Sequence, residues 1–189
     1  MDVSACPKIP WRGEVWRAHH GKYRGDDAGG SHLFSGRYNC GIDLYPDDPD
    51  WGTHHEAGEV WPALYAGLSW GICIAEQLRH LGPSTLLSKL ANLQLSQLRL
   101  DLEHVLDCTD LKIPGADPDL LFHNTDYTAG RELARSARAI GCEALLLPSA
   151  SQIPDDDARI MVVFPDLLRS TSVLRVVRTV KPSLVNPQP

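Results

Sequence analysis

The arrangement of strand-like and helix-like segments constrains the fold of this chain more than any other feature. Two segments, 70–81 and 128–140, place apolar residues at the three- and four-residue spacing of a helix with one buried side. Shorter segments, rich in apolar and β-branched residues, predict strands at 14–19, 61–67, 92–100, 143–147, 159–164 and 172–180. These strands outnumber the helices and do not alternate with them as in a doubly wound sheet, so the pattern predicts an α+β fold.

Local signals refine these elements. Ser69 is a suitable N-cap for the first helix, and Gly141 is a suitable C-cap for the second. In segment 92–100 the leucines change parity halfway along. A β-bulge near Ser96–Gln97 would keep the leucines before it and after it on the same inner face.

Charge and cysteine content exclude several classes of protein. The 189 residues carry 18 Lys and Arg against 24 Asp and Glu, which is too acidic for non-specific nucleic-acid binding. The five cysteines lack CxxC spacing, which favours reduced thiols, and the apolar neighbours of Cys73 and Cys142 predict inert core thiols. The sequence has neither a membrane-spanning segment nor the features of a signal peptide. We therefore expect a cytoplasmic protein.

The length fits one domain over 1–189, with a core of about 14–166 and a C-terminal strand and tail at 167–189. Segment 43–60 contains no Lys or Arg and is rich in Asp, Pro and Gly. Such a composition predicts an acidic, exposed loop inserted into the domain.

Metal sites and phosphate-binding loops lack their usual signatures. The run His54-His55-Glu56 begins like HExxH, but Glu59 stands where the second histidine would be. The chain has no glycine-rich phosphate loop and no GxSxG nucleophile elbow. We therefore expect no metal site and no serine-hydrolase centre.

Short patterns that join polar residues to strand ends and turns are more informative. They are Trp16-Arg17, Gly36-Arg37-Tyr38-Asn39, Ala63-Leu64-Tyr65, Ile74-Ala75-Glu76 and Pro148-Ser149-Ala150. Each has an ordinary structural explanation when taken singly: a surface ion pair, a core tyrosine, a solvated helix residue or a turn. Their order along the chain gives them meaning as a set.

Together, these patterns resemble those of the RES-domain family, which is named for its Arg, Glu and Ser and supplies the toxins of Xre–RES toxin–antitoxin pairs. The resemblance extends over about 16–166. It is poorest in the acidic insert, which stands where members of the family have a short turn. The insert therefore bears on substrate access without removing any of the matched residues.

The resemblance implies a fold like that of ADP-ribosyltransferases, with a split β-sheet core and flanking helices, and an action on NAD. It implies that Arg17 and Arg37 grip the pyrophosphate, and that Tyr65 stacks on the nicotinamide. Glu76 would bind the ribose and stabilise the oxocarbenium-like transition state, so Glu76, Arg37 and Tyr65 are the catalytic candidates. Ser149 would donate a hydrogen bond near the ribose or phosphate, and is not expected to be a nucleophile because no histidine base is tied to it.

The implied function is that of a toxin that depletes NAD by cleaving its nicotinamide–ribose bond, with water or inorganic phosphate as acceptor. NAD would be a substrate, and no prosthetic group is implied. Two alternatives stay open: mono-ADP-ribosylation of a protein, and a non-catalytic binding module. Ile74 disfavours arginine modification, because arginine-specific transferases of similar fold carry an acid two residues before the catalytic glutamate. The implied partner is an Xre-type antitoxin, with a homodimer in the complex left open, and neither nucleic acid nor membrane is an expected partner.

Overall fold

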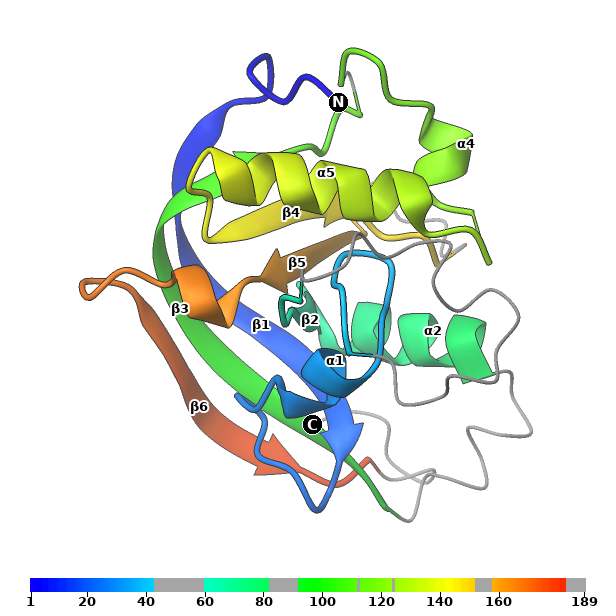
Figure 1. Cartoon of the computed structure of the whole chain (residues 1–189). Helices are drawn as coiled ribbons and strands as arrows, with labels where there is room; N and C mark the ends of the chain where they lie inside the picture. Colours follow the sequence, from blue (N-terminus) through cyan, green and yellow to red (C-terminus); the bar gives the residue numbers. More distant parts are fainter. Residues whose placement is uncertain (43–59, 82–91, 112, 124, 152–157, 183–189) are drawn as a thin grey trace.

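A six-stranded sheet forms the centre of the protein (Figure 1). The computed structural model describes residues 1–42, 60–81, 92–111, 113–123, 125–151 and 158–182. Within them the strand order is β1-β2-β5-β4-β3-β6, and a further pairing of β1 with β3 closes the first five positions of this order into a ring. The strands are β1 Lys8–His20, β2 Leu64–Gly67, β3 Leu93–Asp107, β4 Ala144–Pro148, β5 Arg159–Val163 and β6 Val173–Val180.

The longest strand, β3, divides one of its edges between two partners. One edge pairs with β1 along almost its whole length. The other edge pairs with β6 over Leu95–Asp101 and with β4 over Val105–Asp107. The sheet splits where this edge of β3 changes from one partner to the other. Strand β6 runs antiparallel to β3 and forms the outer edge, whereas β4 runs parallel to β3 (Figure 1).

Two helices of twelve residues cover the sheet. Helix α2 (Trp70–Leu81) packs against β1 and β2, and α5 (Thr128–Ala139) lies beside β4 (Figure 1). The predicted caps are confirmed: the Ser69 hydroxyl accepts the Ile72 N–H at 3.3 Å, and Gly141 follows α5 with a φ of +74°. The shorter helices are α1 (Gly29–Leu33), α4 (Pro118–Leu121) and the 3₁₀ helix η2 (Pro165–Leu167).

A β-bulge in β3 is satisfied by a buried carboxylate. The register between β1 and β3 shifts at Pro10, where Glu103 and His104 oppose a single residue of β1. Pro10 has no N–H to donate, so a ladder bond is missing there in any case. The N–H groups of Glu103 and His104 instead donate to Glu143 Oε2 at 2.8 and 2.9 Å. The proline within the strand also explains why the sequence pattern predicts β1 only from residue 14.

The predicted bulge at Ser96–Gln97 is wrong. The register of β3 with β1 is unbroken through this segment, and the irregularity nearby lies in β6, where Val177 is the extra residue. The leucines are nevertheless buried on both sides of the parity change. Leu95 belongs to one apolar cluster and Leu98 to another, so both faces of β3 are covered and no bulge is needed.

The mixed α+β class predicted from the sequence is confirmed by this architecture. The predicted strands are all present, although β3 extends to Asp107 and β2 begins at Leu64. The predicted acidic insert, 43–60, lies outside the described residues except for its last position, and so does the end of the predicted tail. Among the described residues, no helix is long and apolar enough to cross a bilayer.

Candidate functional site

A pocket of about 370 Å³ opens between β1, β2, α2 and the loop that follows α1. This volume lies within the range of small-molecule sites. Tyr127, the residue before α5, completes one wall. The lining residues are Arg17, Ala18, Ser31, Ser35, Gly36, Arg37, Ala63, Tyr65, Ala66, Gly67, Cys73, Glu76, Gln77, Tyr127 and Ile160.

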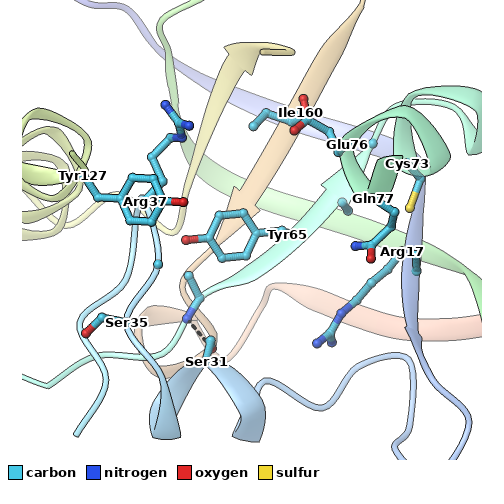
Figure 2. A pocket seen from close by; sticks show the side chains of 15 residues that line it. Arg17, Ser31, Ser35, Arg37, Tyr65, Cys73, Glu76, Gln77, Tyr127 and Ile160 are labelled. Carbon is cyan, nitrogen blue, oxygen red and sulfur yellow. Dashed lines mark hydrogen bonds between the residues drawn. The ribbon is translucent and has the colours of Figure 1, made fainter. Parts of the chain in front are cut away.

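The two arginines of the predicted site line opposite parts of this pocket. Figure 2 shows Arg17 and Gln77 on one side of Tyr65, and Arg37 with Tyr127 on the other. Both cations are therefore available to an anionic ligand, but they approach it from different directions.

Arg17 projects from β1, and its Nη1 donates to the Gly25 carbonyl at 2.9 Å. That bond anchors the side chain to the loop between β1 and α1. Burial lowers the pKa of the guanidinium, and the nearby Asp27 carboxylate opposes this shift. Arg17 is thus a partly desolvated cation with further donors available at the pocket.

Arg37 is the more deeply buried cation, with only 6% of its surface exposed. Its Nη1 donates to the Leu121 carbonyl at 2.6 Å, and its guanidinium lies over the Tyr127 ring, 5.2 Å from the ring centroid. Within the described part of the chain, Nη2 is buried without a hydrogen-bond partner. Burial lowers the pKa of this group. A buried guanidinium with an unused donor is a favourable partner for a ligand oxygen.

Tyr65 holds the Arg37 loop through its hydroxyl. The hydroxyl accepts the Tyr38 N–H at 2.8 Å and donates to Asn39 Oδ1 at 2.9 Å. The Asn39 amide in turn donates to the carbonyls of Ser31 and Phe34 at 2.5 and 2.8 Å. The polar end of Tyr65 is therefore used within the protein, and the ring itself forms part of the pocket wall.

Glu76 lies on α2 and is held by the turn that follows β4. Its Oε1 accepts the Ser149 hydroxyl at 2.5 Å and the Ser151 N–H at 2.9 Å. The Ser149 and Ser151 hydroxyls are also 2.5 Å apart. Arg79 lies 3.9 Å from Oε2, one helical turn further along. The carboxylate is thus fixed in orientation by the serine turn while its side chain lines the pocket.

The structure brings the residues predicted from the sequence motifs together. Arg17, Arg37, Tyr65 and Glu76 line one pocket. Ser149 is not among the lining residues and instead contacts Glu76. The functional roles assigned to these residues stay predictions.

Sequence reasoning missed Gln77 and Tyr127, which also line the pocket. Gln77 had a local signal, because it is adjacent to Glu76 on a helix of which one side faces the site. Tyr127 had none, because only the folded arrangement brings the start of α5 to the loop that holds Arg37.

The cysteines do not form disulfides, and all five are buried. Cys73 lines the pocket, but burial raises the pKa of its thiol to about 12. A thiol of that kind is a poor nucleophile at neutral pH, in agreement with the predicted inert role. Among the described residues, no cluster of three His, Cys, Asp or Glu side chains could hold a metal ion.

Comparison with known proteins identifies relatives of this fold. The family model for the RES domain matches residues 14–180. The crystal structure of the M. tuberculosis MbcT–MbcA toxin–antitoxin complex contains a similar chain, with a TM-score of 0.71 and 20% sequence identity. The match covers 94% of this chain and 88% of that one, and identity at this level supports the fold alone. No curated protein matches the chain.

Proposed function

The chain belongs to the RES-domain family, and from this premise we propose that it consumes NAD by cleaving the bond between nicotinamide and ribose. One observation carries the proposal. The buried Arg37 guanidinium, with an unused donor, and the serine-held Glu76 carboxylate line the same pocket. NAD presents an anionic pyrophosphate and a ribosyl carbon that becomes cationic as the bond breaks. A site that cleaves this bond therefore needs a cation for the pyrophosphate and a carboxylate for the ribosyl carbon.

Glu76 would act on the ribose. As the C1″–N bond breaks, its electron pair goes to the nicotinamide nitrogen, and positive charge develops on the ribosyl carbon and ring oxygen. A carboxylate fixed beside that centre stabilises the charge more in the transition state than in the ground state. The bonds from Ser149 and Ser151 keep one oxygen of Glu76 in place and leave the other oxygen towards Arg79.

The arginines and Tyr65 would hold the rest of the substrate. Arg37, with its unused Nη2, would bind the pyrophosphate, and Arg17 would bind a second anionic group on the other side of Tyr65. The Tyr65 ring, fixed by its two hydroxyl bonds, would stack on the nicotinamide. These contacts require no resident cofactor, because NAD is itself the substrate.

The bond that breaks must be replaced by a new bond from the ribosyl carbon to an acceptor oxygen. Water would give ADP-ribose, and inorganic phosphate would give its 1″-phosphate ester. The structurally similar protein occurs in a toxin–antitoxin complex, so we include in the proposal that NAD loss makes this chain a toxin with an antitoxin partner. Protein ADP-ribosylation is disfavoured for arginine acceptors by Ile74, which stands two residues before Glu76.

The direct test incubates the purified protein with NAD, with and without phosphate, and separates the products chromatographically. We expect NAD loss with release of nicotinamide, and Glu76→Gln should lower kcat about a hundredfold or more. Glu14→Gln is a matched control, because Glu14 lies on β1 in an exposed ion pair with Arg99. Labelling of protein by a tagged NAD analogue would favour transferase activity. Neither NAD loss nor labelling would reject both enzymatic functions.

A further inference from the structure

The start of α5 packs closely against the loop that contains Arg37. The Arg37 guanidinium lies over the ring of Tyr127, the residue just before the helix. The centroid of the same ring is 6.0 Å from the guanidinium carbon of Arg131. The Arg131 Nε donates to the Gly36 carbonyl at 3.1 Å. The loop is thus held both at its backbone and at its arginine side chain by one turn of the chain.

Gly130 makes this close approach possible. A Cβ atom at Gly130 would lie 2.6 Å from the Arg37 carbonyl oxygen and 2.8 Å from its Cγ. No side chain fits between the helix and the loop, so the relative position of Tyr127 and Arg37 is closely fixed.

The guanidinium is buried but makes few hydrogen bonds. Within the described residues its one hydrogen bond goes from Nη1 to the Leu121 carbonyl, and this hydrogen bond alone does not fix the direction of Nη2. The Tyr127 ring covers one side of the group, and a planar guanidinium favours a parallel arrangement on an aromatic face. A ring at this place limits the directions in which Nη2 can donate.

We propose that Tyr127 is a positioning residue whose ring orients Arg37 for the anionic part of the substrate. This inference rests on the proposed action on NAD. It assigns the function to the ring and not to the hydroxyl, and it places the effect of Tyr127 on binding through Arg37. Tyr127 therefore differs from Tyr65, whose hydroxyl holds the loop through the Tyr38 N–H and the Asn39 side chain.

Steady-state kinetics of the full chain test this assignment. Tyr127→Leu should raise the KM for NAD about tenfold with kcat within about twofold of wild type, and Tyr127→Phe should keep both values, because it keeps the stacking ring. Tyr127→Gln, which lacks the ring but is polar, decides the question if the leucine variant does not fold. Tyr23→Leu is a control at an exposed tyrosine outside the pocket lining.

A double-mutant cycle shows whether the effect passes through Arg37. In an Arg37→Ala background, Tyr127→Leu should cause no further rise in KM. If the rise in KM in the double variant equals the product of the rises in the two single variants, the inference is overturned, because Tyr127 would then contact the substrate directly. An unchanged KM in both Tyr127→Leu and Tyr127→Gln would overturn it as well. Wild-type protein that consumes no NAD would instead reject the proposed function, so the two failures are distinguishable.

Discussion

A single hydroxyl group connects two of the residues that the motifs single out. Ser149 donates to Glu76 at 2.5 Å from a turn that α2 does not adjoin in sequence. A hydrogen bond to a charged group contributes about 1.5–3 kcal/mol, which is enough to keep a carboxylate in one orientation. Under the proposed function, Ser149 would thus act through Glu76 and not on the substrate.

Ser149→Ala should therefore lower kcat for NAD consumption about ten- to a hundredfold, because Glu76 loses one of its orienting donors. The loss is partial because the Ser151 N–H still donates to the same oxygen. Loss of a bond of this strength should also lower Tm by several degrees. Ser136→Ala, in α5 and outside the pocket lining, is the matched control. A kcat equal to that of wild type would show that the Ser151 N–H alone positions Glu76.

Residue types in the site were predictable, whereas their partners were not. The motifs identified Arg17, Arg37, Tyr65 and Glu76 because each of these residues lies within one of the short sequence patterns. They could not show that the Tyr65 hydroxyl is used to hold the loop, or that Tyr127 lies against Arg37. These contacts join residues far apart in sequence, and no local pattern records them.

At the scale of the elements, one carboxylate joins three segments. Glu143 is fully buried, and its Oε1 accepts the Arg169 N–H at 2.9 Å and the Ser172 hydroxyl, while Oε2 satisfies the bulge of β3. Burial acts to raise the pKa of Glu143, but these hydrogen bonds outweigh it and hold the pKa below its usual value. The carboxylate thus fixes the bulge and the start of β6 together.

Glu143→Gln should lower the free energy of unfolding by roughly 3 kcal/mol, since an amide NH₂ would face donors in place of one oxygen. Because the folded pKa is lowered, the contribution of Glu143 is present above the unfolded pKa near 4.5 and is lost as pH falls through the folded value. Urea unfolding at several pH values measures both effects. Glu14→Gln, at an exposed ion pair, should cost less than about 1 kcal/mol. Equal losses for the two variants would contradict this role.

A second buried group joins β1, β3 and β6. His19 Nε2 lies 2.8 Å from the Ser96 hydroxyl, which lies 2.7 Å from the Thr179 hydroxyl. With Nδ1 donating to the His20 carbonyl at 3.1 Å, Nε2 accepts from Ser96, and the neutral imidazole satisfies the chain of bonds. Burial lowers the pKa of His19, since the charged form would lose solvation.

The unfolded state therefore takes up the His19 proton first as the pH falls. Stability should decrease as pH falls through about 6.5, the ordinary value, towards the folded pKa. His19→Gln cannot be protonated and should flatten the dependence of unfolding free energy on pH below about 6.5. His20→Gln, at the exposed neighbouring histidine, is the matched control. An unchanged slope in His19→Gln would assign the dependence to other groups.

Apolar patterns predicted most elements, but not how the strands are covered. The leucines of β3 change parity because the strand is buried on both faces, which a single chain pattern cannot distinguish from a bulge. The actual bulges lie at Glu103–His104 and in β6, where the sequence pattern gave no signal. Their positions depend on the Glu143 carboxylate and on pairing with neighbouring strands.

At the scale of the whole molecule, net charge and site charge have opposite signs. The chain carries a net charge of −6, yet the pocket presents two arginines, both partly desolvated. Local cations in a shielded pocket affect a small anion more than distant surface carboxylates, which solvent and salt screen. The acidic composition disfavours non-specific nucleic-acid binding, but it does not predict the charge of a small ligand.

The pocket is also built from elements that lie far apart in sequence, so a ligand should tie β1, β2, α2 and the start of α5 together. A ligand that binds only the folded state at 100 times its Kd stabilises it by about 2.7 kcal/mol. For a chain of this size that corresponds to a rise in Tm of about 5–10 °C.

We expect this rise when NAD is added to Glu76→Gln, which should bind NAD without consuming it. Adding Arg37→Ala should make the shift much smaller, whereas the exposed Arg12→Ala should preserve it, since Arg12 pairs with Asp101 on the sheet surface. A shift of equal size in both double variants would mean that NAD binds somewhere other than at Arg37, because a site that depends on this buried guanidinium cannot keep its affinity without it.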